Sequence, residues 1–148
     1  ALIVIEDEIK LHEYIKTGID VDGIITSQLL INIFEKNTPL HDGAVIIKNN
    51  RVAAATCFLP LSDSMEISKD LGTRHRAAIG ITEGTDALVL VVSEETGIIS
   101  SVRNGKIKRG LDAEIIKKIL LATKKRKRSD KKRLERKKVI WKGKNKHE

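Results

Sequence analysis

Short apolar runs bounded by turn-forming residues recur along the chain and predict a β-sheet. The expected strands cover residues 2–5, 44–48, 51–59, 86–92, 98–103 and 106–109. Asn49-Asn50 and Asn104-Gly105 each separate two of these runs, and both pairs tolerate the positive φ of a two-residue hairpin turn. The sequence therefore predicts two antiparallel hairpins.

Other segments carry apolar residues at helical spacing. We expect helices over residues 8–16, 26–34, about 73–82 and from 112 onward, with Thr26 or Ser27 capping the second and Asp112 the last. The Asp-Val-Asp-Gly segment at residues 20–23 predicts a turn. Hairpins make antiparallel pairs and intervening helices allow parallel ones, so the predicted fold class is α/β: a single globular domain with a central mixed β-sheet flanked by helices.

Composition supports this picture, because 148 residues with 41% apolar and 32% charged content suit one soluble domain with a core. Cys57 is the only cysteine, which excludes an intrachain disulfide and fits a reducing compartment. No apolar stretch approaches the roughly 20 residues of a membrane-spanning helix. Ala1 opens the chain inside an apolar run without an initiator Met, so we expect the natural sequence to continue upstream.

Charge divides the chain into two parts. Residues 124–148 hold 14 Lys and Arg against three acidic residues, a net +11, whereas residues 1–123 carry a net −3. We expect a globular domain over 1–123 and a basic, flexible tail over 124–148. The tail has two other interpretations, contact with anionic lipid headgroups, anchored by Trp141, or binding of nucleic acid. An aromatic content of 3% and the acidic domain disfavour nucleic acid.

A first polar cluster, His41-Asp42-Gly43-Ala44, stands at the entrance of a predicted strand. The Asp42 carboxylate there suits metal binding or deprotonation of a hydroxyl, and the small Gly43 and Ala44 leave room for a ligand. Asp-Gly pairs also mark ordinary turns, and His41 is either a ligand or a structural residue. The cluster alone does not decide between these interpretations.

A second polar cluster, Gly72-Thr73-Arg74-His75-Arg76, opens a predicted helix. Basic residues oppose the helix dipole at that end, which indicates a bound anion rather than an ordinary basic helix start. Arginine binds phosphate bidentately, and Thr73 adds a hydroxyl. Glu94-Glu95 offers a further carboxylate or forms a solvated turn, and Phe58 with Leu59 is either core or a surface for base stacking.

Four segments together resemble the catalytic domain of diadenylate cyclases, in particular the membrane-anchored CdaA type. They are Pro39 to Val45, Cys57 to Ser62, Leu71 to Ala78 and Val92 to Gly97, and the resemblance covers about residues 1–122. It implies a bacterial nucleotidyltransferase that condenses two ATP molecules into the second messenger cyclic di-AMP and releases two pyrophosphates. It also implies Mn²⁺ or Mg²⁺, and sometimes Co²⁺, as cofactor. No Walker-type loop or Rossmann glycine fingerprint is present.

The resemblance assigns roles to both clusters. The implied catalytic residues are Asp42, Arg74, His75 and Arg76; the nucleotide-binding residues are Gly43, Ala44, Phe58, Leu59, Thr73, Arg74, His75, Ser93 and Glu95; the metal ligands are Asp42, Glu95 and His41. Catalysis would need a homodimer in which two chains, each holding one ATP, meet face to face. The family implies a location at the cytoplasmic face of the cell membrane through upstream helices, this chain alone being soluble. An inactive ATP-binding relative is the alternative.

Overall fold

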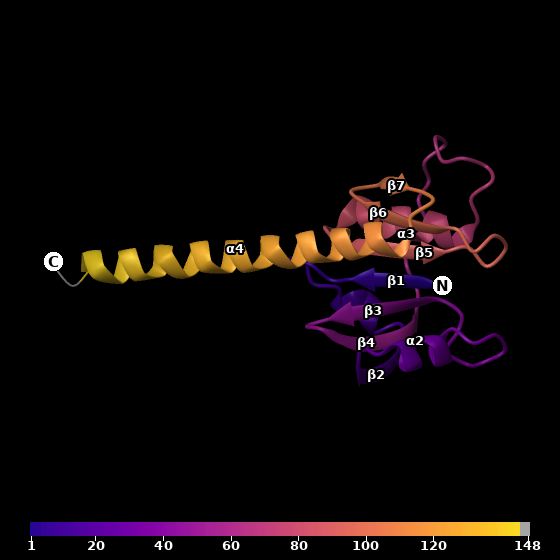
Figure 1. Cartoon of the computed structure of the whole chain (residues 1–148), viewed down its shortest axis with the longest axis horizontal. Coiled ribbons are helices and arrows are strands. Elements are labelled where there is room, and N and C mark those ends of the chain that lie inside the picture. Colours follow the sequence, from indigo (N-terminus) through magenta and orange to yellow (C-terminus); the bar gives the residue numbers. More distant parts are fainter. Residues whose placement is uncertain (146–148) are drawn as a thin grey trace. The chain divides into compact units, whose positions relative to one another are not determined.

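The computed structural model describes residues 1–145 and divides the chain into two compact units, one ending at Leu111 and the other beginning at Asp112. The first unit has the α/β fold class that the sequence predicts (Figure 1). Its elements, in chain order, are β1 (Leu2–Ile5), α1 (His12–Ile15), β2 (Ile19–Ile24), α2 (Ser27–Ile33), β3 (Ala44–Lys48), β4 (Arg51–Cys57), α3 (Thr73–Gly84), β5 (Leu88–Val92), β6 (Ile99–Arg103) and β7 (Lys106–Lys108).

The seven strands form one mixed sheet in the order β2-β4-β3-β1-β5-β6-β7. Central strand β1 pairs in parallel with β3, where Ile3 lies opposite Val45, and antiparallel with β5, where Leu2 lies opposite Val91. The beginning of β3 and the end of β5 therefore meet at the same edge of the sheet. Both predicted hairpins are present, with positive φ at Asn49, Asn50, Asn104 and Gly105.

Apolar side chains pack on both faces of the sheet, and these two core clusters anchor the helices. Val4, Ile46 and Val89 are fully buried in the cluster that also receives Ala78 and Ile81 of α3. Val45, Val52 and Ile33 form the smaller cluster beneath α2. The strand period of two sends neighbours such as Val45 and Ile46 to opposite faces. This packing holds the first turn of α3 at the sheet edge described above.

Two predictions near the N-terminus are wrong, and local hydrogen bonds explain both. Residues 20–23, predicted as a turn, belong to edge strand β2, where the register shifts and Asp22 adopts φ +48° while binding Arg51; turn-forming residues are accommodated in such a bulge. The helix expected over 8–16 is reduced to α1. Carboxylates of Glu6 and Asp86 accept the backbone N–H groups of residues 8, 9 and 11 and hold this segment in a non-helical conformation.

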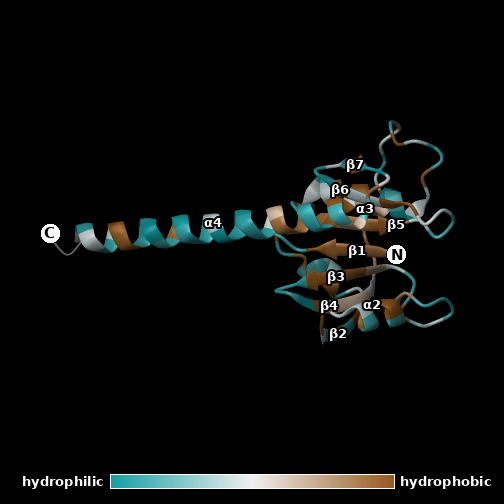
Figure 2. Ribbon diagram, viewed as in Figure 1, coloured by the Kyte–Doolittle hydropathy of each residue, from teal (hydrophilic) through white to brown (hydrophobic). Residues whose placement is uncertain are grey.

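The second unit contains helix α4 (Ala113–Asn145), and the predicted Asp112 cap is present, since its Oδ1 accepts the Ile115 N–H at 2.9 Å. The helix continues through the basic segment for which the sequence predicts an extension without regular structure; residues 146–148 of that segment lie outside the described part. Lys and Arg have high helix propensity, which favours this continuation. Figure 2 shows the segment as mostly hydrophilic with isolated apolar positions. Within residues 1–145, no helix has the length and apolarity needed to cross a membrane.

Candidate active site

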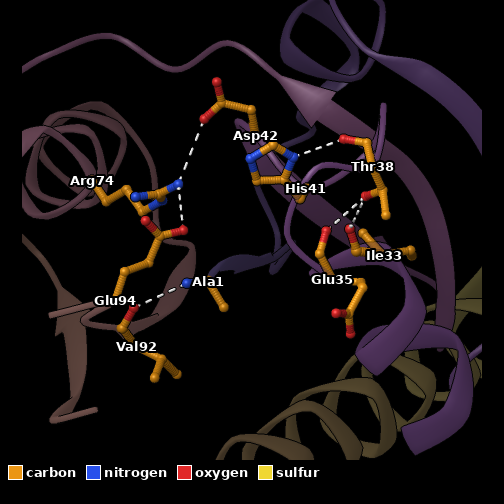
Figure 3. A network of polar contacts seen from close by, with 9 residues as sticks. All are labelled: Ala1, Ile33, Glu35, Thr38, His41, Asp42, Arg74, Val92 and Glu94. Carbon is orange, nitrogen blue, oxygen red and sulfur yellow. Dashed lines mark hydrogen bonds and ion pairs between the residues drawn. The ribbon is translucent and has the colours of Figure 1, made fainter. Parts of the chain in front are cut away.

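Arg74 lies between two carboxylates that come from distant parts of the chain. Its Nη2 is 2.9 Å from Glu94 Oε1 and 3.5 Å from Asp42 Oδ1 (Figure 3). Asp42 precedes β3, Glu94 follows β5 and Arg74 belongs to the first turn of α3, so the sheet edge brings the three together. The Asp42 side chain is 85% exposed, against 28% for Arg74. The carboxylate is therefore accessible to a ligand, whereas the guanidinium is held in place.

The backbone at Gly43 explains how Asp42 reaches this position. Gly43 has φ +80°, and a Cβ there would lie 2.9 Å from the Thr56 carbonyl carbon of neighbouring strand β4. Only glycine satisfies both requirements, because other residues are strained at this φ and would collide with backbone. The Asp-Gly pair thus forms a tight entry into β3, and the same turn leaves Asp42 exposed. The sequence leaves open whether Asp42-Gly43 is an ordinary turn or part of a ligand site. The structure allows both, because the turn itself exposes the carboxylate.

His41 has a defined proton position next to Asp42. Its Nδ1 lies 2.7 Å from the Thr38 carbonyl oxygen (Figure 3). A carbonyl oxygen only accepts hydrogen bonds, so Nδ1 carries the proton and donates it to this bond. Nε2 is then the ring atom that can face a ligand, which is the arrangement typical of histidines that bind a metal or a substrate oxygen.

The N-terminus of α3 opens into a depression of about 520 Å³. Helix α3 has 12 residues, and its N-cap Gly72 provides no side chain to bind the first backbone N–H groups. These amides and the helix dipole favour a negative charge. Of the predicted site residues, Thr73, Arg74, His75, Ser93 and Glu95 line the depression; its other lining residues are Lys69, Asp70, Leu71, Gly72, Val92, Glu94, Thr96, Ile98 and Arg109.

His75 is the buried member of the second polar cluster. Burial lowers the pKa of its imidazole, and the positive charge of Arg109 lowers the pKa further against an opposing effect of Asp70. A lowered histidine pKa means that the ring is neutral at pH 7. His75 therefore contributes hydrogen-bonding atoms to the depression, and the positive charge comes from arginine and lysine.

Besides His41, Asp42 and Gly43, four further predicted residues lie outside the lining of the depression. Phe58 is 74% exposed, so the core alternative is wrong for it, while the half-buried Leu59 packs against the main core cluster. Ala44 is fully buried as the first residue of β3. Arg76 is half-buried one turn into α3, and its carbonyl oxygen accepts the Ser62 N–H at 3.1 Å. None of the four is among the residues that line the depression.

Sequence reasoning missed several residues of this site. Glu94 contacts Arg74, although the resemblance points to its neighbour Glu95. The Glu94-Glu95 pair is visible in the sequence, but the choice between its members depends on side-chain direction at the end of β5. Asp70 and Arg109 also line the depression and form an ion pair at 3.1 Å. They are 39 positions apart and belong to no motif, so nothing in the sequence indicates that they meet.

The donor set suits a hard divalent cation that is shared with a bound phosphate. Within residues 1–145, no three His, Cys, Asp or Glu side chains converge to form a complete metal site. Mg²⁺ and similar cations are commonly held by one or two carboxylates together with substrate phosphates and water. The exposed Asp42 carboxylate beside an anion-binding helix end provides such a partial site, with His41 Nε2 as a further donor atom.

The site can bind a phosphate, neutralise it and place a carboxylate beside it. Those are the functions that phosphoryl transfer requires of a protein, because its transition state is stabilised by positioning and charge. Burial, aided by the charge of Asp20, raises the pKa of the Cys57 thiol to about 11, which makes it a poor nucleophile at neutral pH.

Comparisons with known proteins agree on one family. The model of the family described as DisA bacterial checkpoint controller nucleotide-binding (DAC) matches residues 1–107. The cyclic di-AMP synthase CdaA of Bacillus subtilis is 57% identical over 122 residues, and a diadenylate cyclase of Listeria monocytogenes is 57% identical over 121. Each alignment covers 82% of this chain but 45% and 44% of the relative, so the chain spans less than half the length of these proteins.

Two solved structures are similar as well. A double mutant of DacA from Staphylococcus aureus superposes with a TM-score of 0.81 at 54% identity, covering 83% of this chain and 82% of that one. A protein of Bacillus cereus described as a hypothetical membrane spanning protein superposes with a TM-score of 0.73 at 49% identity, covering 76% and 55% of the two chains. The match extends across the α/β unit that carries the depression.

Proposed function

The chain belongs to the DAC family of bacterial nucleotide-binding domains, and on that premise we propose that it is the catalytic domain of a diadenylate cyclase. The reaction would condense two ATP molecules into cyclic di-AMP and release two pyrophosphates. One observation carries the proposal: Arg74 is fixed between Asp42 and Glu94 at the open N-terminus of α3, beside a depression large enough for a polyphosphate. The names of the relatives support the same reaction.

In this mechanism the residues position two reacting groups. The 3′-hydroxyl of one ATP attacks the α-phosphorus of the other, in line with the departing pyrophosphate. Arg74 and the free amides of α3 bind the attacked phosphate and offset the charge that develops on it. Asp42 faces the attacking hydroxyl and accepts its proton as the new bond forms. The neutral His75 and the Thr73 and Ser93 hydroxyls hold further phosphate or ribose oxygens by hydrogen bonds.

A divalent cation, Mn²⁺, Mg²⁺ or Co²⁺, fits this arrangement. Asp42 would hold it together with phosphate oxygens, with His41 Nε2 and the Glu95 carboxylate as additional donors. Bound there, the cation would lower the pKa of the 3′-hydroxyl and neutralise phosphate charge. Asp42 remains the group that orients the hydroxyl.

Two chains would be needed for one product molecule. Cyclic di-AMP contains two equivalent phosphodiester bonds, so each of two face-to-face chains contributes one ATP and one copy of Asp42. The 85% exposure of the Asp42 side chain supports this arrangement, because the carboxylate is open to a nucleotide that another chain carries. The exposed Phe58 with Leu59 would receive the adenine by stacking and apolar contact.

Incubating the purified chain with ATP and Mn²⁺, and identifying the nucleotides by mass spectrometry, tests the activity. We expect cyclic di-AMP, and an initial rate that rises more steeply than linearly with chain concentration because two chains must associate. Absence of product across several metals and chain concentrations contradicts the proposal and favours an ATP-binding relative without activity. A rate per chain that is independent of concentration, with a monomeric mass in ultracentrifugation, contradicts the face-to-face arrangement.

The basic part of α4 gives a second, separate proposal: contact with anionic lipid headgroups at the cytoplasmic face of the cell membrane. Residues 124–145 carry 13 Lys and Arg and two acidic residues, and Trp141 is 65% exposed. Each basic side chain near an anionic surface adds up to about 1 kcal/mol of attraction, screened by salt. The description of the Bacillus cereus relative as membrane spanning agrees with this location.

Flotation with lipid vesicles tests this contact. We expect the chain to bind phosphatidylglycerol vesicles at low salt and to dissociate from them at high salt. We expect no binding to phosphatidylcholine vesicles. Reversing three charges, with Lys131→Glu, Lys132→Glu and Arg133→Glu, should abolish binding. Equal binding to neutral vesicles, or displacement from anionic vesicles by low concentrations of RNA, argues against a lipid partner and in the second case for nucleic acid.

A further inference from the structure

Arg109 lies in the depression without belonging to either polar cluster. It follows β7, directly before Gly110, and lines the same depression as Thr73, Arg74 and His75. Its proximity to His75 is also evident in the lowered pKa of that imidazole, to which the Arg109 charge contributes. The Arg109 side chain is 45% exposed. The guanidinium is therefore inside the site and accessible to a ligand.

Asp70 holds Arg109 at this place. Arg109 Nη1 lies 3.1 Å from Asp70 Oδ2, and the Ser68 hydroxyl donates a hydrogen bond to Asp70 Oδ1. These two contacts, the Ser68 hydrogen bond first, lower the pKa of Asp70, so the carboxylate is ionised at neutral pH. The pair links the loop before α3 to the end of β7. A guanidinium has five N–H donors, and a contact through Nη1 leaves Nε and Nη2 for another anion.

We propose that Arg109 binds the β- and γ-phosphates of ATP and that Asp70 positions it for this contact. The inference rests on the proposed function. It adds a polyphosphate subsite, made by Arg109 together with Lys69 of the same depression, to the residues that act at the α-phosphate.

The distribution of side chains in the depression assigns this part to phosphate. Arg74 marks the reacting end, because it contacts Asp42. Phe58 and Leu59, the proposed adenine contacts, are absent from the lining, so the rest of the depression does not receive the base. Lys69 and Arg109 supply two positive charges there, of which the ionised Asp70 offsets one. The β- and γ-phosphates carry most of the negative charge of ATP and must lie next to the α-phosphate, which places them between Arg74 and Arg109.

The binding of two different ligands distinguishes a role of Arg109 in the polyphosphate subsite from a purely structural role. A nonhydrolysable ATP analogue carries β- and γ-phosphates, whereas cyclic di-AMP carries none. For Arg109→Gln we expect affinity for the analogue, measured by isothermal titration calorimetry, to fall about tenfold or more, since charge-assisted hydrogen bonds are lost. Affinity for cyclic di-AMP should stay within about twofold. Asp70→Asn should show the same ligand selectivity with a smaller loss.

Arg51→Gln and Asp22→Asn are matched controls. Arg51 and Asp22 form an ion pair at 2.8 Å between β4 and β2, and Arg51 is 46% exposed, close to the value for Arg109. Neither residue lines the depression. We expect both control variants to bind the two ligands as the unmodified chain does, and all four variants to show melting curves like that of the unmodified chain.

Unchanged binding of the ATP analogue by Arg109→Gln overturns the subsite, and so does an equal loss for both ligands. An unmodified chain that binds the analogue but makes no cyclic di-AMP contradicts the proposed activity alone, because the Arg109 comparison is read from binding. An unmodified chain that binds no ATP analogue overturns both.

Discussion

Replacing Asp42 with asparagine should lower the rate of cyclic di-AMP formation by about 100-fold or more while leaving the fold intact. Asparagine keeps the size of the side chain but accepts no proton and is a weaker cation ligand, and loss of a positioned general base typically costs about 10²–10⁴ in rate. Because the Asp42 side chain is 85% exposed, the substitution should change the free energy of unfolding little. Product measured by mass spectrometry at saturating ATP gives the rate.

Binding separates a chemical role of Asp42 from a role in ATP affinity. Glu94, which lies 2.9 Å from Arg74, is unchanged in the variant, so affinity for a nonhydrolysable ATP analogue should change by only a few-fold. Asp22→Asn is the matched control, because Asp22 is 82% exposed and also pairs with an arginine, at a distant strand edge. Turnover of Asp42→Asn at the unmodified rate, or an equal loss of turnover in Asp22→Asn, contradicts the assignment.

Gly80→Ala should be the most destabilising single-methyl substitution in α3. A Cβ at Gly80 would lie 2.0 Å from the Pro60 carbonyl oxygen and 2.9 Å from the Ser62 nitrogen, and both are backbone atoms that cannot rotate away. The loop is fixed there by the Ser62 N–H to Arg76 carbonyl hydrogen bond. Overpacking of this kind costs about 1–3 kcal/mol, which lowers the melting temperature by about 3–10 °C in a domain of this size.

Gly84→Ala provides the control within the same helix. A Cβ at Gly84 meets nothing within 4 Å, and alanine has the higher helix propensity, so stability should be unchanged or slightly greater. Thermal melting followed by circular dichroism compares the two variants. A Gly80→Ala chain as stable as Gly84→Ala would show that the loop of residues 60–62 moves away at little cost.

The elements that sequence predicts best are those whose local chemistry and packing agree. The β3–β4 and β6–β7 hairpins combine apolar runs with residues that accept positive φ, and both form as expected. Strand β2 is different, because Asp20 and Gly23 favour a turn locally while pairing with β4 imposes a strand. The shortened α1 is similar: carboxylates of Asp86 and Glu6 accept the N–H groups of Ile9 and Leu11, which precede the helix. In both cases a distant partner outweighs a local preference.

The candidate site likewise contains some residues that the sequence identifies and others that only the fold brings together. The sequence shows Asp42 and Arg74 as charged residues next to buried segments, and it indicates a helix start at Thr73. The structure places Asp42 and Arg74 in contact. Identifying the contact of Glu94 with Arg74 requires the side-chain direction at the end of β5. Recognising Arg109 requires the tertiary contact with Asp70, across 39 positions of sequence. A sequence motif identifies residues that are close along the chain, whereas these contacts join residues that are close only in the folded structure.

The pairing of β1 with β5 joins two halves of the sheet that come from separate parts of the sequence. Asp42 precedes the loop of residues 61–70, and Arg74 and Glu94 follow it, as do β5, β6 and β7. A break of the chain within that loop would leave each fragment with one side of the site and one half of the sheet. Neither fragment alone holds the complete set of groups, so catalysis would be divided between two inactive pieces that recover it only when β1 and β5 pair again.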